Sequence, residues 1–213
     1  MSTSKAQTKK ERLLEAAGRV FVEKAFRDAT VAEICDLAGA NIASVNYYFG
    51  GKEALYKETW RHSLTESLKA YPIDGGVPAS APAEERLRGQ LVSLIRRFSD
   101  EKSIDFLIAR MEMVNPSGLL EEVMASELGP VRRQTLALVR ELLGPDATEQ
   151  QVNHCEVSIA SMCIHPVMMQ RLARQDKGRQ MPVIIDDMEA FADQVVRFAL
   201  AGIRAERAEG SRK

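Results

Sequence analysis

The chain has 213 residues, of which 45% are apolar and 28% are charged, and its net charge is −1 at pH 7. These values favour a soluble globular protein of one large or two small domains, and such a charge does not by itself indicate a nucleic-acid partner. Because no uninterrupted apolar run approaches the roughly 20 residues that a membrane-spanning helix needs, a transmembrane protein is excluded. Three scattered cysteines exclude a disulfide framework and are typical of a reducing cytoplasm, where we expect the protein to act.

The N-terminal end is the most basic part of the chain, since residues 1–27 carry seven Lys and Arg against three Glu. Residues 1–7 predict a polar arm, which is either a solvated tail or a segment that touches DNA phosphates. Thr8 and Glu11 have the spacing of a capping box, and apolar residues then recur at helical spacing to about residue 24.

Two short helices follow between residues 30 and 52. Thr30 and Glu33 form a second capping box, and Gly39 lies where the helix that they start must end. Asn41 or Ile42 opens another helix, which Gly50 and Gly51 break after about residue 48. Two helices of about two turns, joined by a few residues that include glycine, are typical of a helix-turn-helix.

The second of these helices is too short to be stable alone, so the preceding helix must hold it. The residues expected at that contact are Ile34, Leu37, Val45 and Phe49. The outer face is then free to enter a DNA major groove, and it carries Asn41, Ile42, Ser44, Asn46 and Tyr48. An asparagine such as Asn46 can bond the N6 and N7 atoms of adenine, and Ile42 or Ala43 can contact a thymine methyl group.

The stretch TVAEICDLAGANIASVNYYFGGKEAL, from Thr30 to Leu55, resembles the DNA-binding segment of TetR-type transcriptional repressors. The resemblance covers residues 8–70, about a third of the chain. It implies that Thr30, Tyr47, Tyr48 and Lys52 contact DNA phosphates. It also implies that the groups facing bases or sugars are Asn41, Ile42, Ala43, Ser44 and Asn46. For Tyr47, closure of the small core is an equally open reading.

A helix from residue 52 to residue 71 comes next, with Trp60 as a packing residue where the DNA-reading segment meets the rest of the chain. Three prolines and two glycines in residues 72–83 then forbid a regular element. The predicted organisation is a DNA-binding domain in residues 1–50, a connecting helix in 51–71, a linker in 72–83 and a helical domain in 84–213.

Only helical patterns occur after the linker. Helices are predicted over residues 83–99, 102–114, 119–126, 131–143 and 148–174, with a bend at Gly129-Pro130. The long helix has Thr148 as its expected N-cap and contains Pro166. Asp186 or Asp187 is expected to cap a last helix to about residue 207. Because no strand pattern appears, the fold class is all-α.

The last two long helices are apolar around much of their circumference, and Ala199, Ala201 and Gly202 would permit close approach of another helix. This surface is either simply core or a four-helix interface between two copies. We expect the interface, because a helix-turn-helix of this size usually reads DNA as a symmetric pair. The same arrangement is implied by the resemblance to TetR-type proteins.

A ligand cavity between helices of the second domain is also expected, since methionines gather there and suit an adaptable apolar site. The candidate lining residues are Phe106, Arg110, Met113, Met162, His165 and Met169. The alternative is that these residues are ordinary core. No compact set of histidines and cysteines forms, and no phosphate-binding or dinucleotide-binding signature occurs, so neither a metal nor another cofactor is expected.

Together these features predict a homodimeric regulator that represses transcription from a palindromic DNA operator and is released by a small apolar or amphipathic ligand. One alternative is a DNA-binding dimer without a ligand. A more distant alternative is an all-α enzyme, although no pair of carboxylates and no nucleophile–base arrangement supports catalysis.

Overall fold

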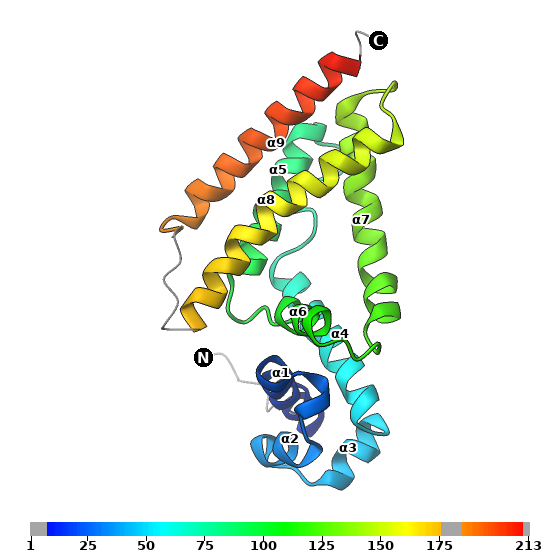
Figure 1. The fold of residues 1–213 in the computed structure, drawn as a ribbon, viewed down its shortest axis with the longest axis vertical. Coiled ribbons are helices and arrows are strands. Elements are labelled where there is room, and N and C mark those ends of the chain that lie inside the picture. Colours follow the sequence, from blue (N-terminus) through cyan, green and yellow to red (C-terminus); the bar gives the residue numbers. More distant parts are fainter. Residues whose placement is uncertain (1–7, 176–184, 211–213) are drawn as a thin grey trace. The chain divides into compact units, whose positions relative to one another are not determined.

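A computed structural model describes residues 8–175 and 185–210 of the chain (Figure 1). Every regular element in these residues is a helix, which confirms the all-α prediction. None of the described helices is long and apolar enough to cross a membrane.

The chain divides into two compact units that do not follow its order. Unit 1 combines residues 1–67 with residues 102–126, and unit 2 combines residues 68–101 with residues 127–213. Residues 102–126 therefore pack with the N-terminal helices, although they lie beyond the linker in sequence.

Unit 1 is built from α1 (Lys9–Asp28), α2 (Val31–Ala38), α3 (Ile42–Phe49), most of α4 (Lys52–Ala70), α6 (Asp105–Val114) and the start of α7 (Glu121–Leu143). Helix α1 packs against both α2 and α6. The largest buried side chains at its centre are Phe21, Tyr56 and Trp60. Trp60 Nε1 donates to the backbone oxygen of Asp105 at 3.1 Å, so the indole is packed and hydrogen-bonded inside unit 1, as its packing role predicts.

Helix α1 is interrupted at Ala25, where φ is 58° and ψ is 177°. This interruption agrees with the predicted end of the first helix near residue 24. The residues after it form a further turn as far as Asp28. The Ala25 side chain is buried, so the surrounding packing holds a backbone conformation that L-residues other than glycine rarely adopt.

Unit 2 contains α5 (Ala83–Ser99), α8 (Glu149–Gln175), α9 (Met188–Gly210) and the remainder of α7. Helix α5 packs against both α8 and α9, and these two helices also pack against each other (Figure 1). Ion pairs fasten the solvent side of the α5–α9 contact, where Arg96 pairs with Glu189 and Arg204 with Glu84. Burial of the apolar sides of α5, α8 and α9 supplies the core of this unit.

Two predictions about helix boundaries are wrong. The structure has one helix, α7, where two helices with a bend at Gly129-Pro130 were expected, and it starts α6 at Asp105 rather than at residue 102. Proline removes the hydrogen bond to the carbonyl four residues earlier, here that of Ser126, yet the helix continues on both sides. The division between the units falls directly after Ser126.

The predicted caps of the last two helices are confirmed. Thr148 exchanges hydrogen bonds with Gln151 at the start of α8, and Asp187 Oδ1 accepts from the backbone N–H groups of Glu189 and Ala190 at the start of α9. These bonds satisfy helix N–H groups that have no partner within the helix.

Candidate nucleic-acid interface and ligand cavity

The start of α2 is fixed by a complete capping box. The Thr30 hydroxyl accepts from the backbone N–H of Glu33 at 3.2 Å, while Glu33 Oε2 accepts from the backbone N–H of Thr30 at 3.1 Å. The Lys24 ammonium donates to the same carboxylate, and together with the bonds from Thr30 it lowers the pKa of Glu33 to about 2. The N-terminus of α2 is therefore held rigidly beside α1.

Helix α3 is delimited at both ends by local interactions. Asn41 Oδ1 accepts from the Ser44 backbone N–H at 3.0 Å and from the Ser44 hydroxyl at 2.7 Å. Gly50 ends the helix with a φ of 81°, a left-handed conformation that favours glycine. The eight residues between them form the short helix that the sequence predicts.

The contact that supports α3 is only partly the predicted one. Ile34 and Val45 are fully buried, and Phe49 is half-buried. Leu37 is 52% exposed, so its expected role in this contact is wrong. Leu37 occupies the side of α2 that faces away from the small core, which the apolar pattern alone did not reveal.

The outer face of α3 is a continuous exposed surface. Its members are Asn41, Ile42, Ala43, Asn46, Tyr47 and Tyr48. Tyr47 is 83% exposed, so it does not close the core. Ser44 is only 7% exposed, and the expectation that it lies on this face is wrong; its hydroxyl and N–H both bond the N-cap residue Asn41.

Two ammonium groups lie beside these helices. Lys52 Nζ donates to the backbone oxygen of Arg27 at 3.4 Å and lies 4.5 Å from the centre of the Phe26 ring. Lys10 Nζ lies 5.7 Å from the centre of the Phe49 ring and 3.8 Å from Glu58. These contacts position both cations on unit 1 without burying their charge.

Comparison with known families decides the identity of this arrangement. Residues 13–59 match the family described as bacterial regulatory proteins, tetR family. Residues 83–203, more than half of the chain, match the family described as the C-terminal domain of the HTH-type transcriptional dual regulator CecR. The chain belongs to the TetR family of bacterial transcriptional regulators. The two matching families are described as bacterial regulatory proteins and as a domain of a transcriptional regulator, and neither is a family of enzymes.

Individual relatives match part of this TetR-family chain. The probable HTH-type transcriptional regulator YttP of Bacillus subtilis is 27% identical over 122 residues, which cover 56% of this chain and 57% of YttP. The HTH-type transcriptional regulator BetI of Brucella anthropi is 40% identical over 58 residues, which cover 27% of this chain and 30% of BetI. The aligned region thus spans little more than half of YttP and under a third of BetI.

Solved structures share the fold over nearly the whole chain. The fatty acid degradation regulator FadR from Bacillus halodurans superimposes with a TM-score of 0.69 at 16% identity, covering 94% of this chain and 99% of that one. A TetR-like transcriptional regulator from Rhodococcus sp. RHA1 gives 0.68 at 17% identity, covering 92% and 96%. At these identities the likeness shows the fold alone.

The second unit of this TetR-family chain contains an apolar cavity of about 260 Å³ between α5, α7 and α8, here called the α5–α7–α8 cavity. Its lining is Leu68, Tyr71, Ile73, Gln90, Leu91, Ser93, Leu94, Arg97, Leu128, Val131, Arg132, Thr135, Glu156, Ile159, Ala160 and Ile164. Leucine, isoleucine and valine make up most of this wall, which is typical of a site for a small organic molecule.

The six residues predicted to line a ligand site do not come together in this cavity. Phe106, Arg110 and Met113 belong to α6 in unit 1, and Met162, His165 and Met169 belong to α8 in unit 2. Met113 and His165 are exposed, and Met162 lines a different hollow, between α8 and α9. None of the six is among the residues that line the α5–α7–α8 cavity. The signal that the sequence does carry is the leucine and isoleucine pattern of α5 and α8, which predicts the two helices but does not distinguish a cavity wall from core.

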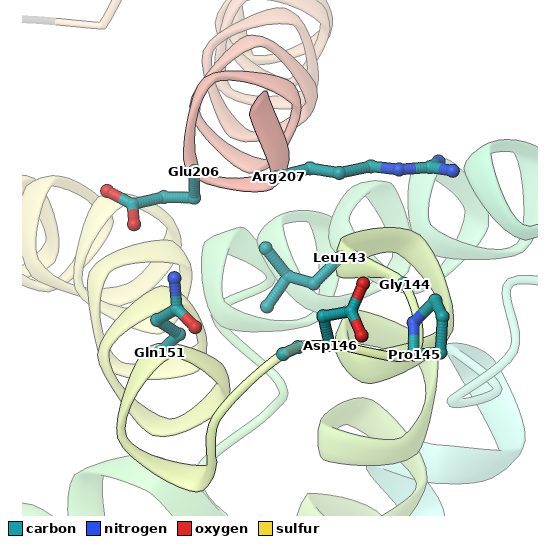
Figure 2. A pocket seen from close by; sticks show the side chains of 8 residues that line it. Leu143, Gly144, Pro145, Asp146, Gln151, Glu206 and Arg207 are labelled. Atoms are coloured by element: carbon teal, nitrogen blue, oxygen red, sulfur yellow. The ribbon is translucent and has the colours of Figure 1, made fainter. Parts of the chain in front are cut away.

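A second hollow of similar volume lies at the connection between α7 and α8 (Figure 2). Gly144, Pro145 and Asp146 form one side of it, and Glu206 and Arg207 leave α9 in opposite directions on the other. Its walls are short of aliphatic side chains, so it does not suit the apolar ligand that the sequence predicts.

The α8–α9 face of unit 2 exposes large apolar groups. Phe198 is 62% exposed, and Val157 is also exposed. Phe198 borders a hollow of about 210 Å³ whose floor includes Met162, Ala199 and Gly202. Among the described residues, no metal-binding group of histidines, cysteines or carboxylates occurs on this face or elsewhere.

Proposed function

We propose that this TetR-family protein is a homodimeric repressor that binds a palindromic operator in double-stranded DNA and leaves it when a small ligand occupies unit 2. The exposed outer face of α3 is the observation that carries the proposal. The chain then has a reading segment in residues 1–50, a connecting helix in 51–71, a linker in 72–83 and a ligand and dimer domain in 84–213, of which residues 102–126 pack in unit 1. Because the proposed partner is operator DNA, we expect the protein to act in the cytoplasm.

The DNA contacts fall into two chemical classes. Thr30, Tyr47, Tyr48 and Lys52 contact phosphates, because hydroxyl and ammonium donors suit phosphate oxygens at the edge of a groove. Asn41, Ile42, Ala43 and Asn46 face the bases, with the Asn46 amide suited to adenine and the two apolar side chains to thymine methyl groups. Ser44 acts through Asn41, whose carbonyl it engages, and thereby positions the start of α3.

The dimer forms through the α8–α9 face. The exposed Phe198 lies beside Ala199 and Gly202. Such a combination of one large apolar residue and small residues suits a helix face that packs closely against the same face of a second copy. A two-fold pair of α3 helices then reads two half-sites about one DNA turn, or roughly 35 Å, apart.

The ligand site is the α5–α7–α8 cavity rather than the set Phe106, Arg110, Met113, Met162, His165 and Met169. A molecule there can shift the protein toward release only if it binds the non-DNA-binding state more tightly. Helices α4 and α7 each have residues in both units and each contributes to the cavity wall, so both are covalent routes by which occupancy reaches the reading helices.

Fluorescence anisotropy with duplexes from the protein's own promoter region tests the DNA function. A palindromic duplex is expected to bind two protomers, with an affinity that falls steeply as salt rises. Absence of any specific complex across the promoter region would overturn the proposal.

The main competing function is a DNA-binding dimer whose second unit only dimerises. Thermal denaturation against a panel of small apolar compounds separates the two, because a ligand that binds only the folded state raises the melting temperature. A panel that yields no stabilising compound favours the ligand-free dimer.

A further inference from the structure

We propose that the α5–α7–α8 cavity takes a small apolar carboxylate of about ten non-hydrogen atoms, held at its acid group by Arg97. The inference rests on the proposed ligand response and names the chemical class that the cavity selects. It follows from the size of the cavity, its apolar wall and the charges that line it.

Size limits the ligand first. A cavity of about 150 Å³ holds one benzene molecule, so the 260 Å³ of this cavity correspond to about ten non-hydrogen atoms. Octanoate and phenylacetate have this size. A long acyl chain of sixteen carbons does not fit within the same volume.

The wall requires an apolar body. Leu91 and Ile159 are buried on α5 and α8, and Leu94 and Val131 are half-buried around them. An aliphatic chain or an aromatic ring that displaces water from this surface gains about 25 cal/mol for each Å² of apolar area removed from water.

Most polar groups of the wall are already engaged with one another. The Thr135 hydroxyl donates to Gln90 Oε1 at 3.4 Å, and the Ser93 hydroxyl donates to the backbone oxygen of Pro72. Arg132 pairs with Glu156 at 3.3 Å, with 55% of the Arg132 side chain and 13% of the Glu156 side chain exposed. The two charges of this ion pair therefore offset each other in the cavity wall.

Arg97 is the buried cation of the cavity lining, with only 7% of the residue exposed. Its buried Nε donor has no hydrogen-bond partner among the described residues. A guanidinium carries five N–H donors, so it can donate to a ligand carboxylate in addition to the contacts that it makes within the protein. A cationic ligand would instead bring a second positive charge beside a buried one, which is unfavourable.

Three matched probes test the class on the full-length protein by isothermal titration calorimetry. Octanoate, octanamide and octylamine each have eight carbons in an unbranched chain and carry an anionic, a neutral and a cationic head group. Octanoate is expected to bind at least about tenfold more tightly than octanamide, because a hydrogen bond to a charged group is lost in the amide. Octylamine and hexadecanoate are expected not to bind.

Variants test whether Arg97 binds the carboxylate. Arg97→Met keeps an unbranched, apolar side chain but removes the guanidinium, and it is expected to reduce the preference for octanoate over octanamide to less than about threefold. Arg96→Met, the matched change at the neighbouring exposed arginine of α5, is expected to keep the preference. Ala160→Phe fills the cavity and is expected to abolish octanoate binding, which provides a second location test if Arg97→Met does not fold.

The outcomes separate this inference from the proposed function. Equal or tighter binding of octanamide or octylamine, absence of octanoate binding, or a preference that survives Arg97→Met would overturn the carboxylate class. Operator binding is measured by anisotropy on the same samples. If octanoate binds as expected but leaves operator affinity unchanged, the site stands and the proposed ligand response fails.

Discussion

The Tyr56 hydroxyl donates to Glu112 Oε2 at 3.0 Å and so joins α4 to α6 within unit 1. Glu112 is buried, and its carboxylate also accepts from the backbone N–H groups of Ser117 and Gly118 and from the Ser117 hydroxyl. The Glu112 side chain thus connects α6, and the loop after α6, to α4. Burial, followed by the adjacent Glu112 charge, raises the pKa of Tyr56, which keeps its hydroxyl protonated and donating.

Loss of this carboxylate is expected to destabilise unit 1. Glu112→Ala leaves the buried Tyr56 hydroxyl and the part-buried donors of Ser117 and Gly118 without this acceptor, and should lower the free energy of unfolding by about 3 kcal/mol. Tyr56→Phe should lower it by about 1 kcal/mol, since it removes a single donor. Urea denaturation measures both changes.

The control for this pair is Glu121→Ala, an exposed change at the start of α7, which should remain within about 0.5 kcal/mol of wild type. In a double-mutant cycle, the combined loss at Tyr56 and Glu112 should be smaller than the sum of the single losses. Full additivity would contradict the hydrogen bond between them.

Ala25→Gly is expected to stabilise the protein. The φ of 58° and ψ of 177° at Ala25 fall in a region that is nearly restricted to glycine, and relief of this strain is worth about 1 kcal/mol after the loss of one buried methyl group. Thermal denaturation measures the change. Ala17→Gly, in the regular part of the same helix, should instead destabilise, by roughly 1 kcal/mol or more. Destabilisation by both changes would show that Ala25 is unstrained.

Glu33 is expected to make folding stability depend on pH in the acid range. Its pKa is lowered from the ordinary 4.5 to about 2 in the folded protein, so its contribution is present above pH 4.5 and is lost as the pH falls toward 2. Glu33→Gln should remove this part of the dependence, as measured by urea denaturation between pH 5 and pH 2. Glu53→Gln, an exposed change in the first turn of α4, should retain it. An unchanged profile in Glu33→Gln would contradict the link to Lys24 and Thr30.

Phe198→Arg is expected to convert the proposed dimer into monomers, because it places a charge at the centre of an apolar contact between copies. Sedimentation velocity should show the shift, and operator affinity should fall with it, while the helical circular dichroism signal stays the same. Gln134→Arg, on an exposed position of α7, should remain dimeric. A Phe198→Arg protein that sediments as wild type would place the interface elsewhere.

The parts of the fold that depend on neighbouring residues could be predicted from the sequence. The capping boxes at Thr8 and Thr30 and the glycine ends of α2 and α3 are encoded within four residues, and each is observed. The exposure of Leu37 and the burial of Ser44 depend instead on the angle at which two short helices pack, which an apolar pattern does not specify.

The predicted ligand site failed for a related reason. Phe106 and Met162 were grouped by composition, but the chain returns α6 to unit 1 and leaves α8 in unit 2. Which helices pack together is decided by long-range contacts such as that of Trp60 with Asp105, 45 residues apart in sequence. Such contacts cannot be predicted from amino-acid composition.

The measurement that tests the central claim most directly is the ratio of operator to non-specific DNA affinity in the variant Asn46→Ala, Tyr48→Ala. If the outer face of α3 reads the operator, fluorescence anisotropy should show this ratio fall to near one in the double variant, with non-specific affinity falling much less. Lys69→Ala, an exposed change near the end of α4, should keep the wild-type ratio. A double variant that keeps the wild-type ratio would contradict the assignment of α3 as the reading helix.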